Sequence, residues 1–151
     1  MQRVVKKVNQ GRVYLFSTPT KAIEFLNGCC MFFFGLVFIF NGAALSQFKF
    51  YVNFSYITPP WLWWLAIFIG ITQLNSMRRD TLESNIMSVL MLKLSSLIWF
   101  VFAVLFGSEY PPLSTGFFTY TWVSFICLMA GFHLGGQNTY ELILREEYRN
   151  T

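Results

Sequence analysis

Four long apolar blocks dominate this sequence of 151 residues and limit what it can fold into. A helix needs about 20 mostly apolar residues to cross a bilayer. Lipid offers no hydrogen-bond partners to the backbone, so each block is expected to be helical. The pattern predicts an all-α integral membrane protein, a single domain with four transmembrane helices. The expected spans cover about residues 25–45, 60–76, 88–107 and 117–135.

The composition favours a membrane protein over a soluble globule. Only 12% of the residues are charged and 55% are hydrophobic, whereas a soluble domain carries about 25% charged residues. A cleaved signal peptide is the rival interpretation of the first block. The basic region before that block is longer than a signal peptide carries, and the apolar run is longer too, so we interpret the block as a span.

The basic residues beside the spans predict the orientation, because cytoplasmic loops are enriched in Lys and Arg. Lys49 is the only basic residue in the two links expected outside. Both termini are therefore expected in the cytoplasm, in a bacterial inner membrane or its equivalent. The topology also accounts for the net charge of +4, so no nucleic-acid partner is expected. Nine basic residues fall on the cytoplasmic side: Arg3, Lys6, Lys7, Arg12, Lys21, Arg78, Arg79, Arg145 and Arg149.

The two terminal segments allow more than one structure. Residues 1–17 are compatible with a short β-hairpin around Asn9-Gln10-Gly11, and equally with a disordered basic tail. Residues 136–151 place Tyr140, Ile143 and Leu144 on one helical stripe. This spacing indicates a cytoplasmic amphipathic helix, on the membrane surface or on a partner. A partly ordered, solvated tail is the alternative.

Small residues recur at helical spacing in every expected span. Gly28, Gly35 and Gly42 are seven residues apart and therefore lie almost on one line of a helix. In lipid, small residues favour association because they let helix backbones approach closely. We expect a compact bundle of two antiparallel hairpins. The sequence leaves open whether the first stripe contacts a helix of the same chain or of another. The other spans carry Ala66 and Gly70, Ser88 and Ser95, and Gly131 and Gly135.

Few polar groups lie within the spans. Lys93 is the only charge well inside one, and such charges are functional candidates by default. It lies near the cytoplasmic end, where its side chain can reach the interface, and Glu24 at the same level is a candidate partner. His133, the sole histidine, is expected to be hydrogen-bonded at the interface. Asn27 and Asn41 are candidates for hydrogen bonds between helices.

The sequence offers no recognisable site for catalysis, a metal or a cofactor. Cys29 and Cys30 are adjacent, so on a helix their thiols point about 100° apart and would hardly bind one ion. With Cys127 they are interpreted as reduced thiols that pack as small apolar groups. The chain contains none of the common hydrolase, zinc-protease or phosphate-loop motifs. An enzymatic role is therefore not expected.

Three functions fit these features. The first is an accessory or regulatory subunit that packs against a membrane partner, or against itself, within the lipid bilayer. The second is a homo-oligomeric pore or holin-like permeabilising protein, whose small size and layout the chain shares without a common motif. The third is a small transporter. Compact four-span multidrug exporters depend on a glutamate within the first span, whereas Glu24 lies at its edge.

Overall fold

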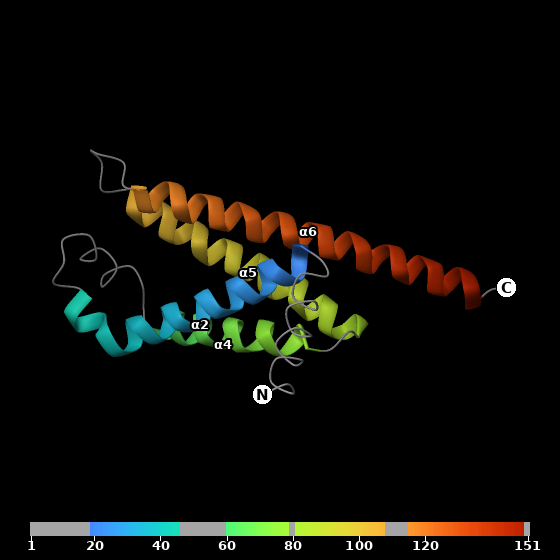
Figure 1. The fold of residues 1–151 in the computed structure, drawn as a ribbon, viewed down its shortest axis with the longest axis horizontal. Helices are drawn as coiled ribbons and strands as arrows, with labels where there is room; N and C mark the ends of the chain where they lie inside the picture. Colours follow the sequence, from blue (N-terminus) through green and yellow to red (C-terminus); the bar gives the residue numbers. More distant parts are fainter. Residues whose placement is uncertain (1–18, 46–59, 79–80, 108–114, 150–151) are drawn as a thin grey trace, which may run out of the picture.

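The described part of the chain is helical and contains no strand. The computed structural model describes residues 19–45, 60–78, 81–107 and 115–149, with only the backbone of 19, 42–45, 141 and 145–149. The β-hairpin considered for residues 1–17 lies outside the described residues. The helices are α2 (Pro19–Leu45), α4 (Pro60–Ser76), α5 (Leu82–Gly107) and α6 (Thr115–Arg149) (Figure 1).

Three of these helices are long and apolar enough to cross a membrane. They span Thr20–Asn41 in α2, Leu82–Gly107 in α5 and Thr115–Leu144 in α6. The prediction of an all-helical chain is therefore confirmed for the described residues, and three of its four helices have the length and apolar character of membrane spans. The fourth helix, α4, has 17 residues. It is about 26 Å long at 1.5 Å per residue, slightly shorter than the hydrocarbon core of a bilayer, which is about 30 Å thick.

Local sequence accounts for where two helices begin. Pro60 opens α4, and proline suits the first turn because its missing N–H would have no partner there. Before α5, the Thr81 hydroxyl accepts a hydrogen bond from Ser84 N, and Thr81 N donates to Ser84 Oγ. This reciprocal pair of hydrogen bonds caps the first turn of α5. Ser84 is buried beside Thr81, whereas Glu83 is exposed.

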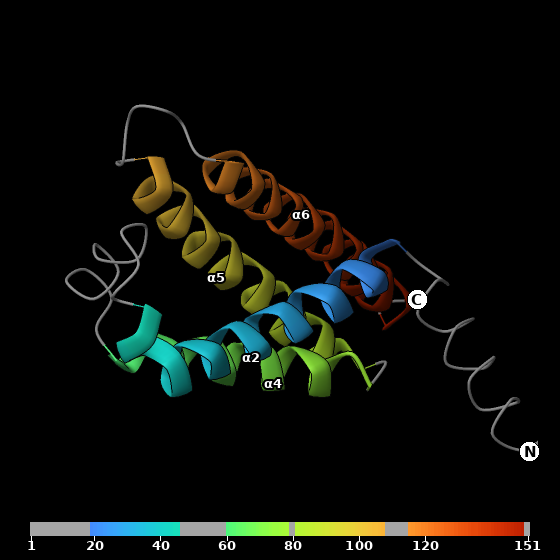
Figure 2. The same cartoon turned by 60° about the vertical axis from the view of Figure 1, so that its left-hand side comes forward.

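The helices form two antiparallel pairs that meet at an angle. α2 packs along α4, α5 packs along α6, and the pairs contact each other chiefly through α4 and α5. Both ribbon views show the pairs close together near the 78–81 link and diverging toward the ends at Leu45 and Gly107 (Figures 1 and 2). The core is thus narrow at one end and wide at the other.

Gly28 and Gly35 of α2 face α4 of the same chain. A Cβ added to Gly35 would lie 2.6 Å from Ile67 Cγ1 and 2.8 Å from the Trp63 carbonyl oxygen, both too short. One added to Gly70 would lie 2.7 Å from the Gly28 carbonyl oxygen. Gly28 and Gly35 therefore contact α4 of the same chain. Gly42 belongs to α2, but its surroundings lie outside the described residues.

Gly131 and Gly135 of α6 approach α5 less closely than Gly35 approaches α4. Cβ atoms added to Gly131 and Gly135 would meet Leu92 Cβ and Val89 Cγ1 at 3.4 and 3.7 Å. These are close to ordinary contact distances. Both glycines therefore face α5, but the contact does not require glycine at either position. The remaining small residues of the predicted stripes, Ala66, Ser88 and Ser95, are all buried.

α6 is longer than a span requires. It runs for 35 residues without a break at Gly135-Gly136, a length of about 52 Å. Its carboxy-terminal part extends beyond the other helices (Figure 1). The tail expected to form a helix of its own after residue 135 is therefore the continuation of α6.

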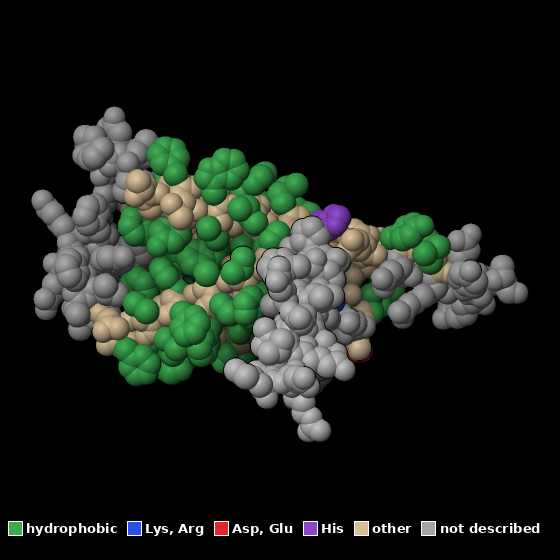
Figure 3. All heavy atoms as spheres, viewed as in Figure 1, with side chains coloured by type: hydrophobic (Ala, Val, Ile, Leu, Met, Phe, Trp, Pro, Cys, Tyr) green, Lys and Arg blue, Asp and Glu red, His purple; other side chains and the backbone are tan. Residues whose placement is uncertain are grey.

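Apolar side chains cover the outside of the bundle. Hydrophobic groups occupy most of the visible face of the described helices (Figure 3). Large rings more than half exposed occur on each helix, a surface suited to lipid rather than water. They include Phe33, Phe40, Trp64, Phe68, Phe100, Trp122 and Phe132.

Candidate functional site

The wide end of the core is filled by an aromatic cluster. The Phe38 and Trp63 rings are stacked at 4.0 Å, and the Trp99 and Tyr120 rings at 5.5 Å. Phe34 joins the two helix pairs, since its ring centroid lies 5.3 Å from that of Trp99. Large rings fit here because the helix pairs diverge at this end. The aromatic cluster consists of Phe34, Phe38, Trp63, Trp99, Phe102 and Tyr120.

Asn27 is the centre of a buried hydrogen-bond network that joins all four described helices. Its Nδ2 donates to Gln73 Oε1 on α4 at 2.7 Å and to Ser95 Oγ on α5 at 2.8 Å. Its Oδ1 accepts from Trp99 Nε1 at 2.9 Å and from Cys127 Sγ on α6 at 3.3 Å. An amide has two donor protons and two acceptor lone pairs, so Asn27 is fully bonded. We call these five residues the polar centre.

The polar centre has only one consistent orientation of its amides. The Trp99 indole can donate but cannot accept, so the atom of Asn27 facing it must be the oxygen. Asn27 Nδ2 then faces Gln73 and must donate its hydrogen bond to the side-chain oxygen of Gln73. Gln73 Nε2 therefore points away from Asn27, and among the described residues it has no hydrogen-bond partner, although Gln73 is 0% exposed.

A row of hydroxyl groups continues from the polar centre toward the 78–81 link. Ser76 Oγ donates to the Gln73 carbonyl oxygen at 3.0 Å and lies 3.4 Å from Ser88 Oγ. Ser88 in turn hydrogen-bonds the carboxyl group of Glu24, which is only 4% exposed. Ser76, Ser88 and Glu24 are called the serine row below. Three helices therefore contribute polar groups to the narrow end of the core.

A second buried hydroxyl pair joins α5 to α6. The Oγ atoms of Ser96 and Ser124 are 3.1 Å apart, and Ser124 Oγ also donates to the Ser96 carbonyl oxygen at 2.8 Å. Serine suits these positions because its small side chain lets the helices approach while its hydroxyl finds a partner across the contact.

Lys93 does not meet Glu24. Its side chain is exposed, with Cγ beside Gly131 and Nζ 4.9 Å from the centre of the Phe132 ring, a cation–π contact. Ser88, the partner of Glu24, precedes Lys93 by five residues, which places the two about 140° apart around α5. The charge close to Glu24 is that of Lys21, three residues earlier on α2.

Apart from Cys127, the other residues considered from the sequence lie outside the polar centre. His133 is exposed and hydrogen-bonds Gln137 at 3.2 Å, and Asn41 is exposed. Cys29 and Cys30 are free, and Cys30 is exposed. Cys127, interpreted as an apolar packing group, instead donates to Asn27. Within the described ranges, no three His, Cys, Asp or Glu side chains are grouped so as to hold a metal ion.

Three of the five residues of the polar centre, Asn27, Ser95 and Cys127, are considered from the sequence. Gln73 and Trp99 are not. A signal for Gln73 exists: it follows Ala66 and Gly70 at the spacing i, i+4, i+7, which places it on the face of α4 that contacts α2. A similar signal exists for Trp99, which follows Ser88 and Ser95 at the spacing i, i+7, i+11 and therefore lies on the same face of α5.

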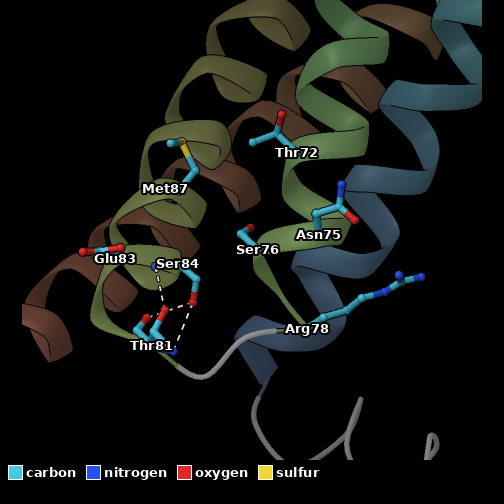
Figure 4. A pocket seen from close by; sticks show the side chains of 8 residues that line it. All are labelled: Thr72, Asn75, Ser76, Arg78, Thr81, Glu83, Ser84 and Met87. Carbon is cyan, nitrogen blue, oxygen red and sulfur yellow. Dashed lines mark hydrogen bonds between the residues drawn. The ribbon is translucent and has the colours of Figure 1, made fainter.

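A pocket of about 500 Å³ lies between α4 and α5 at the end of the serine row (Figure 4). Ser76 points from α4 toward α5, and Arg78 lies nearer the link (Figure 4). Ser76 thus borders both the pocket and the buried polar groups. The pocket is lined by Thr72, Asn75, Ser76, Arg78, Thr81, Glu83, Ser84 and Met87.

Comparison of the chain with protein-family models, with curated proteins and with solved structures yields no match. The structure itself defines a class: a small helical membrane protein whose core is polar at its narrow end and aromatic at its wide end. What such a protein does has to be inferred from its own residues.

Proposed function

We propose that this chain is a four-span membrane protein that acts by helix–helix association as an accessory or regulatory subunit of a membrane complex. In this proposal both termini lie on the cytoplasmic side of a bacterial inner membrane or its equivalent. α4 is counted as a span because it packs along α2 from Gly28 to Gly35 and so shares its depth. The exposed rings of Trp61 and Trp64 suit the interface at its start.

The observation that carries the proposal is the protruding end of α6. A span needs only about 20 residues and, counted from Thr115, ends near Gly135. The helix continues beyond it, apolar as far as Leu144, to Arg149. On this extension Tyr140 is 65% exposed and Ile143 is 57% exposed. Large apolar side chains grouped outside lipid mark interaction sites. We assign the extension to contact with a partner protein at the cytoplasmic surface.

The placement of polar groups favours this role over the holin-like alternative. A homo-oligomeric pore needs polar side chains on an outer face, where neighbouring copies would line a channel. Asn27, Gln73 and Ser95 instead lie inside one chain, where Gln73 and Ser95 both accept hydrogen bonds from Asn27. The glycine contacts of Gly28 and Gly35 are likewise used within the chain, so they are not free to join copies.

Co-purification tests the proposal. The full chain, tagged and expressed in its native host, is extracted in mild detergent and its partners are identified by mass spectrometry. We expect one larger membrane complex that is lost in Ile143→Glu and retained in Leu97→Ala, a matched change at a lipid-facing position 62% exposed. Purification as a ring of identical subunits, with loss of membrane potential on expression, would instead support the pore.

A further inference from the structure

We propose that the narrow end of the core is a hydrated, dead-end site that opens through the pocket between α4 and α5. In it, Gln73 Nε2 donates to a small neutral hydrogen-bond acceptor, which is a water molecule in the resting protein. This site goes beyond the proposed accessory role, and it stands or falls independently of any partner at the α6 extension.

The unpartnered donor is the first step. Buried amide groups in proteins are nearly always hydrogen-bonded, to protein or to ordered water. Gln73 Nε2 is buried and has no partner within the described part of the chain. Rotating the Gln73 amide by half a turn would not give it a full set of partners. Trp99 fixes the orientation of the Asn27 amide, and Asn27 in turn fixes that of the Gln73 amide. The donor therefore calls for an acceptor that the described side chains do not supply.

The surrounding charges select the class of acceptor. A cation is excluded because an N–H group presents positive charge to it. An anion is disfavoured because the carboxyl group of Glu24 is buried in the adjoining serine row. The cation close to that carboxyl group is Lys21, on the same helix. The neighbours that α4 and α5 contribute to this row, Ser76 and Ser88, are uncharged. A neutral acceptor remains, and water can also donate onward to these oxygen atoms.

The pocket supplies the route for water. Ser76 lines the pocket (Figure 4), and its hydroxyl donates to the backbone carbonyl oxygen of Gln73 and lies 3.4 Å from Ser88 Oγ. Beyond the polar centre the aromatic cluster closes the core, with Phe102 0% exposed and stacked on Trp63 at 5.8 Å. Water can therefore enter from the 78–81 link but not cross the bundle.

Cysteine reactivity tests the site, because a thiol reacts as the thiolate, which forms in water and not in an apolar core. The background is Cys29→Ala, Cys30→Ala and Cys127→Ser, the last keeping a donor to Asn27. Into it Ser88→Cys is introduced, with Ala103→Cys as the control; the two positions are 2% and 1% exposed. The probe is methyl methanethiosulfonate, which is small and neutral. We expect Ser88→Cys to react at least about tenfold faster than Ala103→Cys; equal rates would overturn the proposal.

A second measurement needs no cysteine. In the ¹⁵N-labelled native chain, the side-chain amide protons of Gln73 are assigned by their loss in Gln73→Met. Magnetisation transfer from water to these protons is expected, because the bound water contacts Nε2. Absence of transfer to Gln73, with transfer still seen at the exposed amide of Gln137, would refute a hydrated site even if the cysteine variants failed to fold.

Discussion

The Trp99 indole donates to Asn27 Oδ1 at 2.9 Å, and this bond joins the aromatic cluster to the polar centre. Trp99 stacks on Tyr120 on one side and fixes the Asn27 amide on the other. Because the indole cannot accept, its single proton fixes the orientation of the Asn27 amide. That orientation in turn sets the direction of the hydrogen bond from Asn27 to Gln73. The two halves of the core therefore support each other.

Replacing Asn27 by Ala is expected to destabilise the bundle. The change removes four hydrogen bonds and leaves Trp99 Nε1 without its acceptor. Hydrogen bonds between membrane helices contribute roughly 0.6 kcal/mol each, so the free energy of unfolding should fall by about 2 kcal/mol. Unfolding in mixed micelles measures this. The control is Asn41→Ala, which alters an exposed asparagine; an equal loss in both variants would argue against the network.

Replacing Gly35 by Ala is expected to force α2 away from α4. The new Cβ would lie 2.8 Å from the Trp63 carbonyl oxygen, which is backbone and cannot turn aside. Overpacking of this kind costs about 1–3 kcal/mol. The matched control is Gly136→Ala, where a Cβ meets nothing within 4 Å. Thermal unfolding in detergent should distinguish them, and an unchanged melting temperature for Gly35→Ala would be inconsistent with the close contact.

Glu24 and Lys93 are expected to act independently. They lie on different sides of α5, with Lys93 over the Phe132 ring and Glu24 bonded to Ser88. A double-mutant cycle with Glu24→Gln and Lys93→Met should give a coupling energy below about 0.5 kcal/mol. A coupling above about 1 kcal/mol would mean that the two charges pair after all.

Reporter fusions test whether α4 crosses the membrane. If it does, the segments 46–59 and 79–80 lie on opposite sides, and fusions after Val52 and after Arg79 give opposite readings with an alkaline phosphatase reporter. The basic residues Arg78 and Arg79 predict that the second position is cytoplasmic. Equal readings would mean that the protein has three spans and that α4 packs against α2 without crossing the membrane.

The composition of the chain accounts for what could be predicted. Lipid cannot satisfy backbone groups, so apolar blocks of this length become helices whatever their neighbours are. Glycine spacing likewise predicts the face of α2 that receives a neighbour, since the helical period places Gly28 and Gly35 on one line. These features depend on local sequence and on the solvent, and both are known before folding.

The tertiary structure decided which polar groups meet. Gln73 faces Asn27, and Lys93 turns to Phe132 rather than to Glu24, because the crossing of the helix pairs sets which faces are in register. α6 continues past Gly135-Gly136, which interrupts the apolar pattern but leaves helical hydrogen bonds intact. The sequence of a helix predicts which residues lie on each of its faces. Which faces touch depends on contacts between residues such as Asn27 and Cys127, 100 positions apart, and these exist only once the helices have packed.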